Sequence, residues 1–131
     1  MLAYLNGEPG GDLVRGILFD QERDVAVYAH AINLAEVFYD FLRSNDQATA
    51  EAAIADLKAA GVIERNDMDA AFWRDVAMLI NTQRSASFKL ALGDACGLAL
   101  ARRESCDFYT SDRTELAPVQ AAGLCAVTFI R

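Results

Sequence analysis

Three acidic side chains could bring metal chemistry to this chain: Glu36, Asp94 and Asp112. Asp94 opens a helix rich in small residues, and Asp112 follows the short strand expected at 108–110. Glu36 is expected in the first turn of a helix that follows a β-prone run. Carboxylates held close together repel one another and raise at least one pKa unless a cation neutralises their charge. Mg²⁺ or Mn²⁺ suits such an all-oxygen site, which substrate phosphates would complete.

Each of these acids also has a purely local explanation. Asn33-x-x-Glu36 and Asp112-x-x-Glu115 both match a capping box, and Asp94 is favourable at the positive end of a helix dipole. Taken singly, each acid is better explained by capping, whereas the three together favour a metal site. Their convergence on one site is a hypothesis that spacing alone does not prove.

The elements that must position these acids follow from apolar periodicity and turn residues. Helices are expected at about 13–18, 34–43, 45–60, 67–80, 94–103 and 114–122, and strands at 25–28, 62–64, 108–110 and 125–130. Asn33 and Asp67 are expected to cap two of the helices, and a polar loop is expected after Arg84. Alternating strands and helices predict a parallel sheet covered on both faces, with ligands at the carboxyl ends of its strands.

The length and composition of the chain predict one domain, and its charge limits the kinds of partner that it could bind. Its 131 residues are 53% hydrophobic, enough for a single core, and its formal net charge is −7. Nucleic-acid binding by general attraction is disfavoured by this charge, because phosphates are captured by Lys and Arg. An RNA partner would need a local basic patch. The candidates for it are better explained as ordinary surface charge, and they are Arg84, Lys89, Arg102, Arg103 and Arg113.

Several other chemistries are excluded. The three cysteines are widely spaced without a CxxC pair, which argues against disulfides or zinc and for a reducing cytoplasm, and Cys96 and Cys125 are expected to be core thiols. His30 is the only histidine, so a histidine-rich metal site cannot be built. Neither a dinucleotide fingerprint nor a P-loop occurs, and no leader or membrane-spanning segment is recognised.

Several segments together resemble PIN-domain ribonucleases, in particular the VapC toxins of bacterial toxin–antitoxin pairs. LAYLNGEPG resembles the segment after the family's first strand, and HAINLAEVFYDFLR the helix with its second acid, here Glu36. LALGDACGLALARR resembles the helix with the third acid, Asp94, and DFYTSDR the strand and turn with the last, Asp112. The final ELAPVQAAGLCAVTFIR resembles the closing helix and strand.

The resemblance implies a PIN-like three-layer α/β/α fold and a Mg²⁺- or Mn²⁺-dependent endoribonuclease that hydrolyses RNA with metal-activated water. It also implies a cytoplasmic homodimer inhibited by a small VapB-like antitoxin. Glu36, Asp94 and Asp112 would be both the catalytic and the metal-binding residues. Thr110 matches the hydroxyl residue of the family's T-x-D motif and would support the site, and Arg113 is a candidate RNA contact.

One departure from the family pattern leaves an alternative open. The family's first strand, which ends in Asp-x-Ser, has no counterpart here, so the sequence reads as a single PIN-like domain that lacks its N-terminal strand and first acid. Met1 would then be either an internal methionine, which we favour, or the start of a truly short chain. In the second case the chain would be a catalytically impaired module that binds an antitoxin. Trp73 and Met78 could contribute to such a surface, although core packing is the expectation for both.

Overall fold

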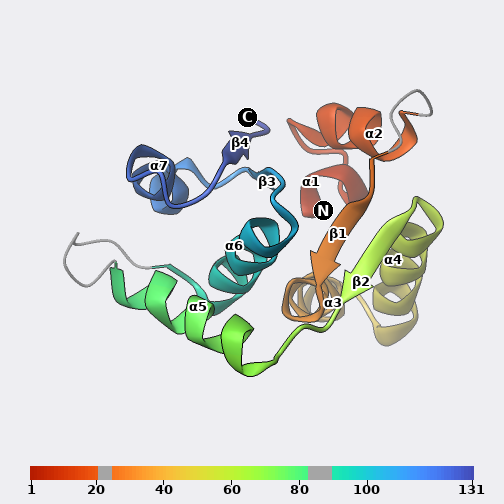
Figure 1. Cartoon of the computed structure of the whole chain (residues 1–131). Helices are drawn as coiled ribbons and strands as arrows, with labels where there is room; N and C mark the ends of the chain where they lie inside the picture. Colours follow the sequence, from red (N-terminus) through yellow and green to blue (C-terminus); the bar gives the residue numbers. More distant parts are fainter. Residues whose placement is uncertain (21–24, 83–89) are drawn as a thin grey trace. The chain divides into compact units, whose positions relative to one another are not determined.

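The computed structural model of the chain describes residues 1–20, 25–82 and 90–131. It is a mixed α/β structure in which helices dominate and the strands are short, as labelled in Figure 1. The chain divides into two compact units. Unit 1 consists of residues 1–66 with 130–131, and unit 2 of residues 67–129.

Unit 1 begins with two short helices, α1 (Leu2–Leu5) and α2 (Gly11–Phe19), separated by a glycine-rich turn. Gly10 in this turn has a φ of 89°, in the left-handed region that glycine adopts without strain. A Cβ at this position would also lie 2.6 Å from the carbonyl oxygen of Ile130. Glycine is therefore required here by both its backbone conformation and its surroundings.

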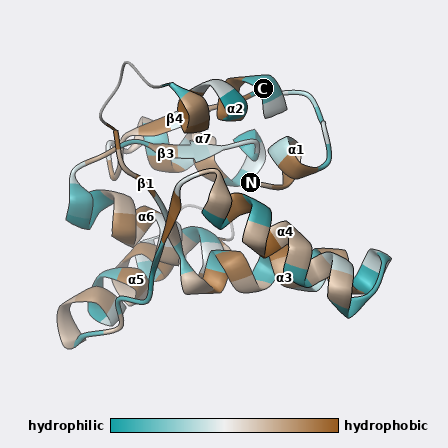
Figure 2. Ribbon diagram, turned by 90° about the vertical axis from the view of Figure 1, so that its right-hand side faces the viewer, coloured by the Kyte–Doolittle hydropathy of each residue, from teal (hydrophilic) through white to brown (hydrophobic). Residues whose placement is uncertain are grey.

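The core of unit 1 is a parallel strand pair packed against two helices. β1 (Val27–His30) leads into α3 (Ala31–Ser44), which is followed by α4 (Gln47–Ala59) and β2 (Val62–Arg65). β1 pairs with β2 in parallel, and both helices contact this pair, as Figure 1 shows. Brown and teal residues alternate along α3 and α4 in Figure 2, as expected for helices with one buried face. The buried residues that cluster in this core are Ala29, Leu34, Val37, Leu57 and Val62.

The start of α3 was predicted wrongly, whereas α4 was predicted well. His30, and not Asn33, is the N-cap of α3, because its ring nitrogen Nδ1 accepts a hydrogen bond from the backbone N–H of Ile32 at 3.2 Å. The helix therefore begins three residues before the predicted Leu34, and the preceding strand ends two residues later than expected. At α4 the carboxylate of Asp46 accepts from the backbone N–H of Thr49 at 2.8 Å, as an aspartate cap does.

Unit 2 contains three helices and a second parallel strand pair. Its elements are α5 (Ala70–Thr82), α6 (Leu92–Glu104), β3 (Phe108–Thr110), α7 (Arg113–Ala121) and β4 (Val127–Phe129). β3 and β4 pair in parallel. The strands of the described ranges thus form two two-stranded sheets. Parallel pairing is confirmed, the three-layer α/β/α arrangement stays a prediction, and the loop predicted after Arg84 lies outside the described residues.

Helix α6 is buried along most of its length, which its small side chains allow. Every residue from Gly93 to Ala101 except Asp94 is buried. A helix so rich in alanine and glycine can lie close against its neighbours, because it has few large side chains to keep them apart. Cys96 is buried in this helix as predicted, while Cys125 is half-buried with its Sγ 3.9 Å from the carbonyl oxygen of Leu98. All three cysteines are free thiols.

Helix α5 has a buried face and, outside it, two exposed large apolar side chains. Phe72, Val76 and Leu79 are buried, as their spacing predicted. Trp73 and Met78 are 47% and 64% exposed, so the expectation that they pack in the core was wrong. Their helical positions place them outside the buried stripe, because 3.6 residues per turn rotate both away from Phe72 and Val76.

Candidate functional site

Asp112 lies at the junction between β3 and α7, where it caps the helix. Its Oδ1 accepts a hydrogen bond from the backbone N–H of Glu115 at 2.9 Å. The backbone N–H of Asp112 in turn donates to Oγ1 of Thr110 at 3.0 Å. Within the part of the chain that the structure describes, Oδ2 of Asp112 accepts no hydrogen bond. The carboxylate is therefore fixed through one oxygen, and the other is available for a ligand.

Asp94 is the third residue of α6 and is partly buried. Its carboxylate lies in the first turn, where the unpaired N–H groups of a helix favour negative charge. Ala91, the N-cap, has no side chain that could accept a hydrogen bond from this turn. Gly93 and Ala95, the neighbours of Asp94, are both buried. The packing of α6 thus fixes the backbone that carries Asp94.

The N-terminal ends of α6 and α7 are joined by Glu115, whose expected role from the sequence is only to cap its own helix. Oε2 of Glu115 accepts a hydrogen bond from the backbone N–H of Ala91 at 3.4 Å. Asp94 and Asp112 are therefore brought to neighbouring helix ends in unit 2. The predicted capping box of α7 is half confirmed, because Asp112 caps Glu115 but the Glu115 carboxylate contacts Ala91 instead of the Asp112 N–H.

Glu36 belongs to unit 1, so the predicted acidic set is divided between the two units. Since α3 begins at Ala31, Glu36 lies in its second turn and not in its first, and its side chain is exposed. Its Oε2 accepts a long hydrogen bond of 3.5 Å from Nδ2 of Asn33, which lies inside the helix and not at its cap. The predicted Asn33-x-x-Glu36 capping box was therefore wrong.

The donor chemistry of unit 2 suits a hard cation. Asp94 and Asp112 offer carboxylate oxygens, the ligands that Mg²⁺ and Mn²⁺ prefer, and Thr110 adds a hydroxyl next to Asp112. Within either unit, no three His, Cys, Asp or Glu side chains of the described residues are grouped so that they could hold a metal ion together. A cation in unit 2 would accordingly keep several waters, as Mg²⁺ commonly does.

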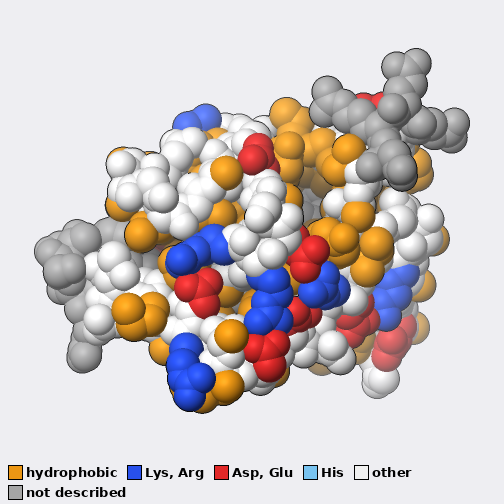
Figure 3. Space-filling model, in the orientation of Figure 1, with side chains coloured by type: hydrophobic (Ala, Val, Ile, Leu, Met, Phe, Trp, Pro, Cys, Tyr) orange, Lys and Arg blue, Asp and Glu red, His pale blue; other side chains and the backbone are white. Residues whose placement is uncertain are grey.

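The candidate basic patch is largely occupied by ion pairs. Arg102 pairs with Asp75 at 2.9 Å, and Arg103 pairs with two aspartates of the segment before α5. In Figure 3 the basic side chains lie among acidic ones. The guanidinium of Arg113 lies 4.5 Å from the centre of the Phe129 ring, next to the Asp112 cap. Arg84 and Lys89 are outside the described ranges.

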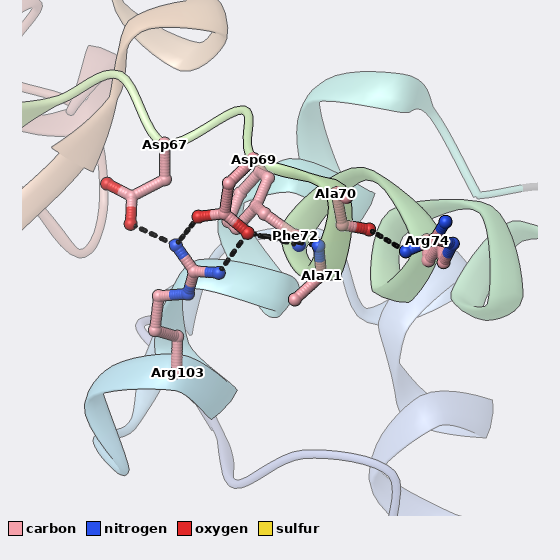
Figure 4. A network of polar contacts seen from close by, with 7 residues as sticks. All are labelled: Asp67, Asp69, Ala70, Ala71, Phe72, Arg74 and Arg103. Atoms are coloured by element: carbon pink, nitrogen blue, oxygen red, sulfur yellow. Dashed lines mark hydrogen bonds and ion pairs between the residues drawn. The ribbon is translucent and has the colours of Figure 1, made fainter.

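The ion-pair network around Arg103 was not foreseen and is shown in Figure 4. Nη1 of Arg103 lies 2.6 Å from Oδ2 of Asp67 and 2.7 Å from Oδ2 of Asp69, and Nη2 contacts Oδ1 of Asp69 at 2.9 Å. Oδ1 of Asp69 also accepts from the backbone N–H groups of Ala71 and Phe72. Asp69, and not the predicted Asp67, therefore provides the hydrogen bonds that start α5.

This network gives unit 2 a predicted sensitivity to acid. The Arg103 guanidinium, helped by the Phe72 amide, holds the pKa of the Asp69 carboxyl well below its usual range. The folded-state pKa is thus lower than the unfolded value of about 3.9, so the stabilisation is complete above that value and is lost as pH falls below it. We expect Asp69→Asn to lower the free energy of unfolding at about pH 6 and to flatten its decline towards about pH 3.

Urea unfolding at several pH values measures this effect, with Asp56→Asn on the exposed face of α4 as the matched control. The control should keep the acid slope of the parent protein. An acid slope that is the same for Asp69→Asn and the parent would contradict the role assigned to this carboxylate.

Comparisons with known proteins give no family for the chain. No family model matches it, and no curated protein matches it. In the described ranges, none of the helices has both the length and the apolar character needed to cross a membrane.

Proposed function

We propose that the chain is a metal-dependent endoribonuclease of the PIN-domain type, similar to VapC toxins. The observation that carries this proposal is that Asp94 and Asp112 lie at helix ends joined by the bond from the Ala91 N–H to Glu115, with Asp112 two residues after a parallel strand. This is a place where α/β proteins bind ligands. The order of the three acidic motifs along the chain gives further support.

In this proposal Asp94 and Asp112 of unit 2 hold Mg²⁺ or Mn²⁺, and Glu36 is the further ligand that the resemblance to PIN domains implies. The cation, when bound, would supply Lewis-acid chemistry that activates water and neutralises charge on the phosphodiester. Oδ2 of Asp112 is the oxygen available for this role, because Oδ1 is engaged in capping α7. Thr110 acts as a support, since its hydroxyl holds the Asp112 backbone N–H. In the hydrolysis, an oxygen–phosphorus bond forms from water, the bond to the leaving ribose oxygen breaks, and that oxygen takes up a proton.

The remaining assignments follow the same resemblance. Arg113 lies beside the Asp112 cap and is proposed to contact a phosphate of the RNA, with the Phe129 ring holding its guanidinium. The finer fold is proposed to be the three-layer PIN arrangement. The protein is proposed to act in the cytoplasm as a homodimer that a small VapB-like antitoxin inhibits.

Cleavage and metal binding test the proposal together. The purified chain is incubated with single-stranded and hairpin RNA in the presence of Mn²⁺ or Mg²⁺, and Mn²⁺ binding is followed by calorimetry. We expect cleavage that EDTA abolishes and that restored Mn²⁺ recovers. If the chain neither binds Mn²⁺ nor cuts RNA, the proposal is wrong. Capture of a small partner protein without Mn²⁺ binding would instead support the antitoxin-binding module that the sequence left open.

A further inference from the structure

The first turn of α7 departs from an ordinary capping box in a way that engages a second helix. In a capping box, the side chain three residues after the N-cap returns to the N-cap backbone N–H. Here that N–H belongs to Asp112 and is already taken by Oγ1 of Thr110 at 3.0 Å. The carboxylate of Glu115, which would otherwise accept it, reaches the backbone N–H of Ala91 instead.

The backbone N–H at the N-cap of α6 donates to the carboxylate of Glu115 and not to a side chain of α6 itself. Ala91 is the N-cap of α6, and its methyl side chain accepts no hydrogen bond. In a capping box the acceptor for the N-cap N–H comes from the same helix, whereas here it comes from a residue 24 positions later in the chain. Glu115 thus makes at α6 the contact that it does not make at α7.

The bond between Glu115 and Ala91 completes a continuous series of hydrogen bonds from α7 to α6. Oδ1 of Asp112 accepts from the N–H of Glu115, Oε2 of Glu115 accepts from the N–H of Ala91, and the carbonyl oxygen of Ala91 accepts from the N–H of Ala95 at 3.0 Å. The turn closed by this last bond contains Asp94. The series therefore links the backbone that carries Asp94 to the carboxylate of Asp112.

We propose that Glu115 is a positioning residue of the metal site, which fixes the first turn of α6 relative to Asp112 through the Ala91 N–H. The inference rests on the proposed function, because it takes Asp94 and Asp112 as metal ligands. A glutamine keeps an acceptor oxygen of the same reach, whereas an alanine keeps none. The two substitutions therefore separate positioning, which needs only an acceptor, from direct metal ligation, which needs the carboxylate.

The experiment compares Glu115→Gln and Glu115→Ala, with Glu51→Ala on the exposed face of α4 as control. Calorimetry with MnCl₂ gives the affinity, and hydrogen exchange of the metal-free protein reports on the Ala91 amide. We expect Glu115→Ala to speed exchange at Ala91 and to weaken Mn²⁺ binding about 10-fold, as loss of an outer-shell partner typically does. In RNA cleavage its kcat should fall more than its KM rises. Glu115→Gln should stay within about 2-fold of the parent in affinity.

A second variant perturbs the same contact without changing Glu115. Thr110→Val removes the acceptor of the Asp112 N–H, which should draw the Glu115 carboxylate back to its own helix and speed exchange at Ala91. Unchanged exchange in both Glu115→Ala and Thr110→Val would overturn the inference. Equal loss of affinity in the glutamine and alanine variants would also overturn it, in favour of direct ligation. Absence of Mn²⁺ binding by the parent overturns the proposed function as well, whereas binding that Glu115→Ala leaves intact overturns this inference alone.

Discussion

Asp94→Asn is expected to lower the rate of Mn²⁺-dependent RNA cleavage by at least about 100-fold. The substitution keeps the size and one carbonyl oxygen of the side chain but removes its negative charge. A loss of about 3 kcal/mol of charge stabilisation corresponds to about a 100-fold loss of rate. Initial rates on a defined RNA, measured with Mn²⁺ in excess, give this ratio directly.

The same variant must be shown to fold. Asp94 lies in the first turn of α6, where an acidic side chain stabilises a helix by about 0.3–1 kcal/mol through its dipole. The melting temperature should therefore fall only slightly. Asp56→Asn removes an exposed aspartate from α4 and should leave cleavage unchanged. Cleavage by Asp94→Asn at the rate of the parent would remove Asp94 from the proposed site.

Local signals in the sequence were sufficient to predict most elements of the fold. Asp46 and Gly61 mark the two ends of α4, and both act within one turn of the helix that they delimit. The small residues of α6 predicted its burial, because a helix without large side chains can approach its neighbours closely. Parallel strand pairing followed from the alternation of strands and helices.

The predicted helix caps were wrong where more than one residue, or more than one partner, could make the capping hydrogen bond. Asp67 and Asp69 could each start α5, and their roles are decided by Arg103, which lies more than 30 positions further along the chain. A glutamate three residues after an N-cap normally caps its own helix, and Glu115 does not, because Thr110 satisfies the N–H first. Such choices depend on contacts between distant residues, which spacing does not reveal.

For the candidate site, the sequence placed each acid on its element but could not supply the contacts between elements. Asp112 was expected directly after β3, and its capping bond to Glu115 confirms that position. The bond between Glu115 and Ala91 joins two helix ends that are separated by a whole helix and a strand, so no local pattern predicts it. A glutamate at the third position of a helix whose N-cap is the aspartate of a T-x-D motif is the signal that could have identified it.

His30→Ala is expected to reduce the free energy of unfolding by about 2–4 kcal/mol. The side chain is only 2% exposed, and its Nδ1 accepts from the backbone N–H of Ile32. Loss of an N-cap typically costs about 0.5–2 kcal/mol, and the cavity left by a large buried side chain adds to this cost. Urea or thermal unfolding of the two proteins at neutral pH measures the difference.

His30→Asn separates these two contributions, because asparagine is among the best N-caps but leaves much of the cavity. It should be more stable than His30→Ala by about 1 kcal/mol while remaining less stable than the parent. Equal stability of the two variants would show that the Ile32 contact contributes nothing and that packing alone fixes the junction. Because β1 ends and α3 begins at His30, this junction also fixes the start of the helix that carries Glu36. A measurable loss of stability in both variants would show that the His30 side chain stabilises this junction, where it accepts the hydrogen bond of the Ile32 N–H at the start of α3.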